Sequence, residues 1–127
     1  MKLGQTKGTQ AARLRQRKFT LLQRYRIPAV VVADLLPGSL TQSERRCGKP
    51  TCHCATGAGH LSWYLAFMAG GKQRVEHIPA AWATAVQRRV AAGREFKQAV
   101  AEVLAANAQL LVLERRRQQQ QQRRRRR

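Results

Sequence analysis

The sequence predicts an α+β fold: a small metal-stabilised domain with a basic N-terminal helix, a Cys-rich loop, one β-hairpin and a long C-terminal helix. Three observations support this prediction. All three cysteines lie within residues 47–54, Gly70-Gly71 separates two runs of bulky residues, and no proline follows Pro79. We expect a basic, helical N-terminal segment over residues 1–28, a folded body over 29–117 and a disordered Gln/Arg tail over 118–127. Polar tracts of this kind bury too little apolar surface to offset their ordering entropy.

The charge of the chain is strongly positive. Its 127 residues include 25 Lys and Arg against six Asp and Glu, and 17 basic residues remain when the eight arginines of 115–117 and 123–127 are left out. Such a body attracts polyanions and binds nucleic-acid backbones by counterion release. We therefore expect nucleic acid, either DNA or RNA, as the partner. The nine predicted contact residues are Arg13, Arg15, Arg17, Lys18, Arg45, Arg46, Lys49, Lys72 and Arg74.

The N-terminal segment carries these basic residues around a narrow apolar edge. Leu14, Leu21 and Leu22 recur at helical spacing, which predicts a helix from about residue 9 to residue 24. This helix should end before Pro28, because the residue that precedes a proline avoids the helical region. It either contacts nucleic acid or is a solvated helix with one apolar edge.

The stretch between this helix and the cysteines is short and apolar. Residues 29–33 are valine or alanine, a pattern that suits either a buried strand or a helical turn. Pro37-Gly38 predicts a turn, and residues 39–43 are expected to form a short extended segment that leads into the cysteines.

Two extended runs flank Gly70-Gly71, which indicates a β-hairpin because both central residues of a type I′ turn need positive φ. If Ala69 pairs with Lys72, Tyr64 lies opposite His77. Both faces of the hairpin are then partly apolar, so we expect it to pack against another element.

Pro79 opens the last element, since proline suits the first position of a helix. Good helix formers dominate the residues from 80 to about 117. Apolar residues spaced by three and four run from Val86 to Leu111 with Asn107 among them, a pattern typical of a coiled-coil face. The segment 86–113 either pairs with a second copy or a partner helix, or lies on its own domain. Gly93 is expected to mark a bend or a break.

Four side chains between residues 47 and 60 form a complete set of metal ligands. The thiolates of Cys47, Cys52 and Cys54 and the imidazole of His60 are the sulfur and nitrogen donors of closed zinc sites. We therefore predict one zinc ion per chain, which would supply folding free energy to a small body. His53 cannot easily join its neighbours on the same ion.

Other interpretations of the cysteines stay open. They could hold an iron–sulfur cluster or another metal, or form unligated thiols in a tight loop that acts as a redox or metal sensor. A disulfide framework is not expected, because the cysteine count is odd and the cluster is tight. No paired carboxylates or catalytic triad are apparent, so we expect no enzymatic activity.

The first 25 residues are basic and polar and lack the apolar centre of a signal peptide, so we expect a reducing, cytoplasmic location. No apolar run approaches the roughly 18 residues needed to span a bilayer, and the basic stretches lack a strong apolar face. Membrane association is therefore not expected.

Residues 46–54 read Arg-Cys-Gly-Lys-Pro-Thr-Cys-His-Cys, and Gly-x-x-His, an aromatic strand, Gly-Gly-Lys and Ile-Pro follow before the long helix. This order resembles an uncharacterised family of small prokaryotic proteins that are often encoded near transposases and other mobile elements. The resemblance covers about residues 37–113 and is specific in its R-C-G-K-P-x-C-x-C core. His53 stands where that family usually has arginine, and Leu61-Ser62 replaces its usual Gly-Pro. The resemblance implies a mobile-element context and carries no established activity.

Overall fold

The computed structural model describes residues 2–127, with side chains from residue 9 onward. The chain divides into two compact units, residues 1–35 and residues 36–127, and each is described by itself.

The first unit consists of α1 (Lys2–Arg24) and the single turn α2 (Ala29–Val32). The predicted helix is present and begins earlier than expected. It ends in a Schellman motif, in which the Ile27 N–H donates to the Leu22 carbonyl at 2.9 Å while Arg26 takes a φ of 53°. This cap ends the helix before Pro28, as the proline requires, and residues 29–32 adopt the helical turn rather than a strand.

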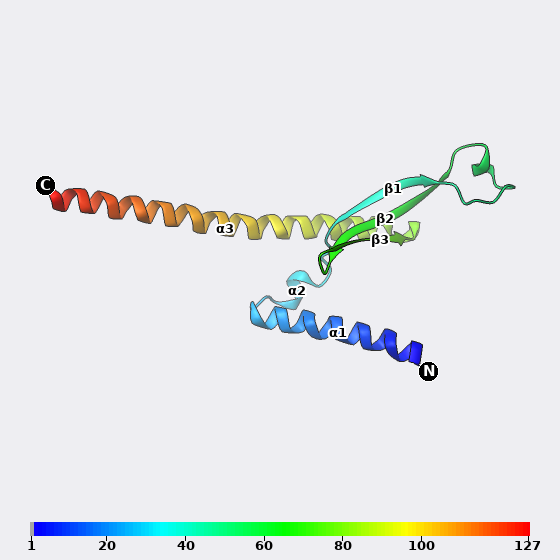
Figure 1. The fold of residues 1–127 in the computed structure, drawn as a ribbon, viewed down its shortest axis with the longest axis horizontal. Coiled ribbons are helices and arrows are strands. Elements are labelled where there is room, and N and C mark those ends of the chain that lie inside the picture. The colour runs from blue at the N-terminus through cyan, green and yellow to red at the C-terminus, as the bar shows by residue number, and fades with distance from the viewer. Residues whose placement is uncertain (1) are drawn as a thin grey trace. The chain divides into compact units, whose positions relative to one another are not determined.

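The second unit is built on a three-stranded antiparallel sheet in the order β1–β2–β3 (Figure 1). Its strands are β1 (Ser39–Arg45), β2 (His60–Ala69) and β3 (Lys72–Ile78). The predicted hairpin is confirmed, because Gly70 and Gly71 have φ of 59° and 78° and Ala69 pairs with Lys72. The sheet has one strand more than predicted: the extended segment from residue 39 continues to Arg45 and pairs with β2 along its whole length.

One face of this sheet packs against the first turns of α3 (Ala83–Arg126), which follows the short 3₁₀ turn η2 (Ala80–Trp82). Leu65 of β2 meets Val86 and Val90 of α3 in the centre of the core. Partly buried apolar residues surround this centre: Leu36, Leu40, Phe67 and Ile78. Only three side chains form the buried centre of this unit, so the core is small.

Gly93 is buried where α3 passes the segment that precedes β1. A Cβ at this position would overlap the Leu36 carbonyl oxygen, and the Leu36 N–H donates to the Arg89 carbonyl at 3.1 Å. The helix runs through Gly93 without interruption, so the expected bend or break is wrong. Glycine is needed here for the space that its missing side chain leaves.

Beyond the sheet, α3 continues as a helix through the glutamine and arginine runs to Arg126, where the sequence predicted a disordered tail. Glutamine and arginine are good helix formers, and extending an existing helix avoids the cost of a new nucleus. Every residue from 97 onward is exposed.

By length and composition alone, the helical stretch Ala80–Arg126 is long and apolar enough to cross a membrane. An 18-residue window within it has a mean hydropathy of 1.2, and none of that window is buried. The prediction that no stretch is long and apolar enough to span a bilayer is therefore wrong. Polar residues interrupt the stretch, but the valine, leucine and alanine residues around them keep the average high.

We predict that Gly93→Ala lowers the free energy of unfolding by about 1–2 kcal/mol, because the added methyl group must displace the backbone of Leu36. Helix propensity alone would give the opposite sign, since alanine is favoured over glycine by about 1 kcal/mol. Urea unfolding followed by circular dichroism measures the change. Ala101→Gly, at an exposed position of α3, is the control and should cost about 1 kcal/mol through propensity only. A stabilised Gly93→Ala variant would contradict the close approach.

Candidate metal centre

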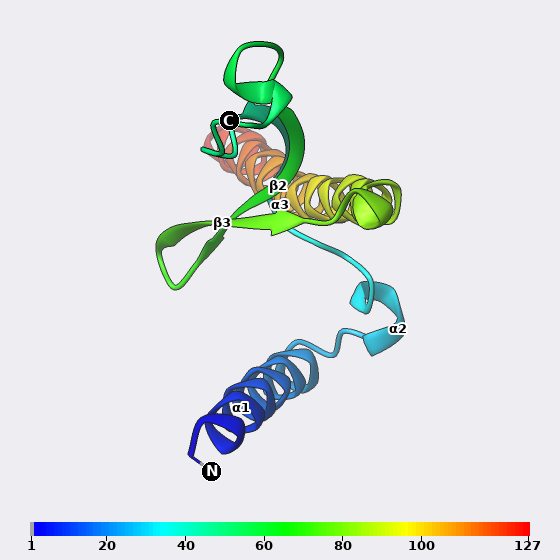
Figure 2. The same cartoon turned by 90° about the vertical axis from the view of Figure 1, so that its right-hand side faces the viewer.

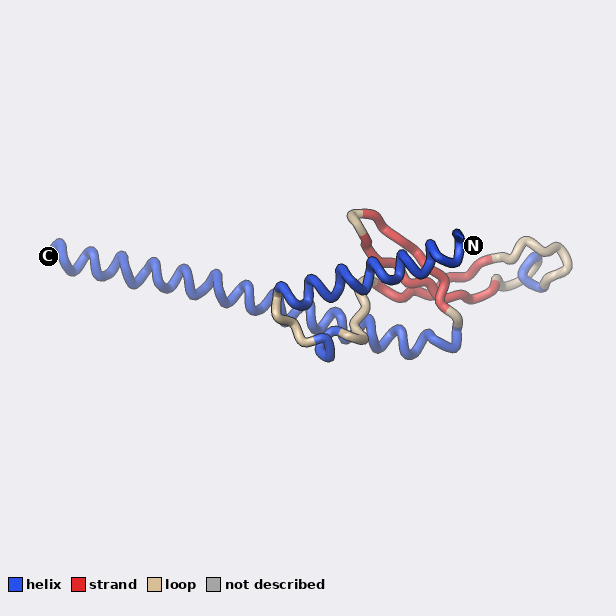
Figure 3. The backbone as a smooth tube through the Cα atoms, turned by 90° about the horizontal axis from the view of Figure 1, so that it is seen from below, coloured by secondary structure: helices blue, strands red, loops and turns tan. Residues whose placement is uncertain are grey.

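The cysteine-rich loop closes the end of the β1–β2 ladder. It comprises residues 46–59, and its two ends emerge from Arg45 and His60, which face each other as the last pair of the ladder. Figures 2 and 3 show the loop projecting beyond the strands, with the short 3₁₀ turn η1 (His53–Ala55) inside it. The ladder therefore fixes the distance between the loop ends and the position of His60.

Four potential ligand atoms converge inside the loop. The donor atoms of Cys47, Cys52, Cys54 and His60 all lie within 4.8 Å of one another. The Cys47 and Cys54 sulfurs are 3.4 Å apart, and the Cys52 sulfur is 3.1 Å from His60 Nε2. Two thiolates on one tetrahedral ion with bonds of about 2.3 Å are separated by about 3.8 Å, so the four atoms are close enough to hold a metal ion.

The backbone of the loop turns polar groups toward the sulfurs. Gly48 has a φ of 82°, which a side chain would disfavour, and the N–H of the preceding Cys47 donates to the Cys54 sulfur at 3.4 Å. Cys54 lies in η1 and is fully buried, whereas Cys47 is exposed and Cys52 is half-buried. The cluster is thus closed on one side and accessible on the other.

The three thiols differ in acidity. A hydrogen bond from the Cys54 N–H, followed by hydrogen bonds from His60 and the other two thiols, lowers the pKa of Cys52 to about 6. At Cys54 the Cys47 N–H favours the thiolate, but burial and the neighbouring thiols outweigh it and raise the pKa. Cys52 is therefore the thiolate that is ready for a metal or an electrophile at neutral pH.

Two side chains that flank the ligands brace the loop. The Arg46 guanidinium donates to the Ala55 carbonyl at 3.1 Å, and the Glu44 carboxylate accepts a hydrogen bond from the Gly59 N–H. The sequence predicts Arg46 as a nucleic-acid contact and indicates no role for Glu44. The sequence signal for these roles is that Glu44 and Arg46 lie within three residues of the ligand Cys47, where a side chain can reach the backbone of the loop.

The remaining histidines lie outside the donor cluster. The exposed His53 ring meets the His60 ring edge-on, with centroids 4.9 Å apart, and its Nδ1 is 3.8 Å from the Cys52 sulfur. His77 lies on β3, where its ring meets that of Tyr64 at 5.6 Å, opposite each other as predicted.

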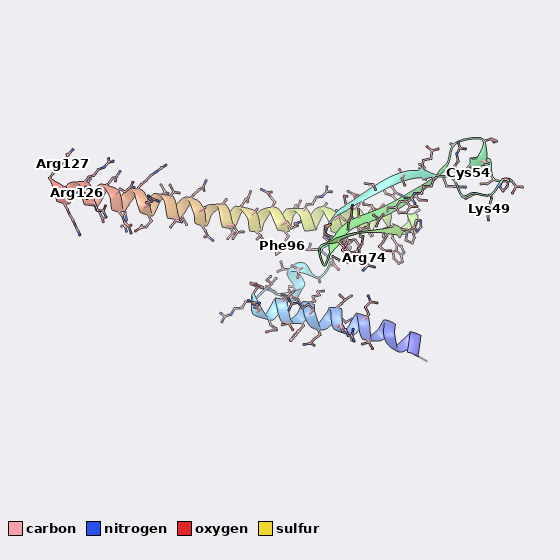
Figure 4. All side chains as sticks on the ribbon, in the orientation of Figure 1. Lys49, Cys54, Arg74, Phe96, Arg126 and Arg127 are labelled. Atoms are coloured by element: carbon pink, nitrogen blue, oxygen red, sulfur yellow. The ribbon has the colours of Figure 1, made fainter. Side chains whose placement is uncertain are left out.

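The structure distributes the nine predicted nucleic-acid contacts over three places. Three of them lie in or directly beside the cysteine-rich loop: Arg45, Arg46 and Lys49. The Arg45 guanidinium lies 4.4 Å from the centre of the Tyr64 ring. Lys72 and Arg74 lie on β3, beside the Gly-Gly turn that follows β2, and Figure 4 labels Arg74 there. The Arg74 guanidinium pairs with the Glu76 carboxylate at 3.3 Å. The four N-terminal residues, Arg13, Arg15, Arg17 and Lys18, are exposed on α1 in the first unit.

A domain of unknown function, DUF6788, matches residues 10–88, which is more than half of the chain. The chain belongs to this family. The match includes all four donor residues, the whole sheet and the start of α3. It begins earlier and ends earlier than the stretch over which the sequence resembles a known pattern. No curated protein and no solved structure matches the chain.

We predict that the metal-free chain is alkylated first at Cys52, with a half-maximal rate near pH 6, because only the thiolate reacts. Below that pH the thiol is protonated and the reaction slows. Cys54 should react more slowly and at higher pH, since its pKa is raised. Mass spectrometry of iodoacetamide-labelled peptides across the pH range gives the three rates.

His60→Ala is the control for this experiment. It removes one of the hydrogen bonds that stabilise the Cys52 thiolate, so the Cys52 midpoint should move upward. Equal rates at Cys52 and Cys54, with midpoints at the ordinary thiol value of about 8.5, would contradict the arrangement of the loop.

Proposed function

We propose that this protein is a non-catalytic, zinc-binding, nucleic-acid-binding accessory protein. The observation that carries the proposal is the set of three cysteines and one histidine, close enough to hold a metal ion, in a loop flanked by basic side chains. The metal would stabilise the loop, and the loop would present positive charge to phosphates.

Zinc is the ion that suits these donors best. Structural zinc sites use four sulfur and nitrogen ligands in a tetrahedron, and three cysteines with one histidine are a common set. The 3.4 Å separation between the Cys47 and Cys54 sulfurs favours one ion over a cluster of several. Bound zinc would hold the thiolates and supply folding free energy, which matters in a unit with so small a core.

If zinc is bound by the four donor residues, substituting a ligand should release the metal, whereas substituting the neighbouring His53 should not. The purified chain should contain about one zinc ion, and Cys52→Ser should lose it together with the order of the loop, because a ligand is removed. His53→Ala should keep the metal, since His53 lies outside the cluster. Elemental mass spectrometry measures the metal, and circular dichroism with and without a chelator measures the fold. Zinc retained in Cys52→Ser would overturn the ligand set.

Nucleic acid is the partner that the charge favours. The formal net charge is +19 at neutral pH, and neutralising phosphates with lysine and arginine releases condensed counterions. Lys49 lies in the loop and is exposed, and none of the hydrogen bonds described for the loop uses its ammonium group. It is therefore the clearest candidate for a phosphate contact beside the metal centre.

Affinity for nucleic acid should fall steeply with salt, and Lys49→Gln should reduce the slope of log K against log salt by about 0.9 on duplex DNA or 0.7 on a single strand. Fluorescence anisotropy with labelled DNA and RNA of equal length gives the slopes. Arg88→Gln, on exposed α3, removes the same charge and is the matched control, expected to leave the slope unchanged. Binding that does not depend on salt would contradict the proposal.

We further propose a cytoplasmic role beside a mobile element. The support is the resemblance of residues 46–54 to small prokaryotic proteins encoded near transposases, together with thiols that suit a reducing compartment. An accessory protein in this setting would bind the nucleic acid on which the element's enzyme acts.

A further inference from the structure

One face of the three-stranded sheet packs against α3, and the other face is open. Successive side chains of a strand point to opposite faces, so the registers of the two ladders place every side chain on one face or the other. Leu40, Leu65 and Ile78 lie on the face that forms the core with α3. The opposite face consists of the odd-numbered residues of β1 and β3 and the even-numbered residues of β2. We call it the open face.

The open face is accessible and positively charged. None of its residues is buried, and Met68 and Val75 are 61% and 54% exposed. Glu44 and Glu76 are the only acidic residues of the three strands, and both lie on the face toward α3. The open face therefore carries the Arg45 guanidinium and no carboxylate.

Three planar side chains lie across the middle of the open face. The Arg45 guanidinium lies 4.4 Å from the centre of the Tyr64 ring. On the neighbouring strand, the His77 ring meets the Tyr64 ring at 5.6 Å, with the two ring planes 74° apart. Each strand of the sheet thus contributes one planar group. We call these three side chains the Tyr64 row.

We propose that the open face binds a single-stranded nucleic acid, whose unpaired bases stack on the Tyr64 row. This inference rests on the proposed function and specifies the partner as a single strand. Unpaired bases stack on aromatic rings and on arginine guanidinium planes, and every base has a π-face, so the contact needs no particular sequence. Aromatic groups combined with positive charge are the usual means of binding single strands.

The phosphates of such a strand would meet positive charge at one end of the open face. Arg45 is the last residue of β1, and the cysteine-rich loop that contains Lys49 follows it directly. A strand stacked on the Tyr64 row therefore lies close to the basic residues beside the proposed metal site. The sheet and the loop would form one continuous binding surface.

Two other occupants fit the open face less well. A duplex keeps its bases paired and stacked inside, so the Tyr64 row would meet only its phosphates. A second copy of the chain would bring a second Arg45 and again no carboxylate to the contact, and like charges repel.

The test uses the full chain with labelled single strands of DNA and RNA and a DNA duplex of the same length, in fluorescence anisotropy over a series of salt concentrations. Tyr64→Leu should raise the dissociation constant for the single strand about tenfold, because one stacking contact is lost. The duplex dissociation constant should stay unchanged. The salt slope should also stay unchanged, because tyrosine carries no charge.

Two further variants are the controls. Tyr64→Phe keeps the ring and should bind the single strand like the parent. Tyr25→Leu removes the other tyrosine of the chain, which is 61% exposed on α1's C-terminal side and has the Arg24 guanidinium 5.4 Å from its ring. It is the matched control and should leave both dissociation constants unchanged.

A measurement on the parent chain tests the contact without any substitution. A single strand that carries iodouracil should form photo-crosslinks to the peptide that contains Tyr64, as mapped by mass spectrometry, because the stacked base lies against this ring. This experiment decides the question if Tyr64→Leu does not fold, which circular dichroism reveals.

The outcomes separate this inference from the proposed function. A parent chain that binds neither single strands nor duplex contradicts both. A parent chain that binds nucleic acid, while Tyr64→Leu loses affinity for both forms equally or for neither, overturns the open face and leaves the proposed function standing. Crosslinks confined to residues 115–127 overturn it as well.

Discussion

The pairing of β2 with strands on both of its sides is the interaction on which the rest of the second unit depends. Residues 60–66 of β2 pair with β1, and residues 63–69 pair with β3. β2 begins at His60, beside the cysteine-rich loop, and ends at the Gly-Gly turn. Leu65, near its centre, lies in the core. A disruption of β2 would therefore affect the donor cluster, the hairpin and the helix packing together.

The residues that form the core of the second unit lie apart from its most exposed segments. A small core and the hydrogen bonds of the three-stranded sheet stabilise the second unit. The cysteine-rich loop adds four donor atoms close enough to hold a metal ion, and a bound ion would add folding free energy. The loop tip, the β2–β3 turn and the distal part of α3 are left exposed. None of these three segments contributes a side chain to the core.

Local chemistry made the hairpin and the ligand set predictable from the sequence. Gly70-Gly71 specified a turn and with it the register, and the cysteine spacing specified the donors. The full length of β1 was not predictable in the same way. Leu40 is the one residue of β1 that packs against the core, and the other six residues are polar, so the strand lacks the apolar–polar alternation that identifies a strand. The role of Gly93 depends on Leu36, which is distant in sequence, and no local pattern reveals such a contact.

Arg45 and His60 are the last facing pair of the ladder, so the cysteine-rich loop could be transferred to another hairpin as one unit. Its two ends lie as far apart as any facing pair in an antiparallel hairpin, and its bracing bonds run between Glu44 and Gly59 and between Arg46 and Ala55, all inside or beside the loop. Grafted between the strands of an unrelated hairpin, residues 44–60 should bring their own ligands and supports. Conversely, replacing the loop by a tight turn would give a sheet of unchanged register that lacks the donor cluster.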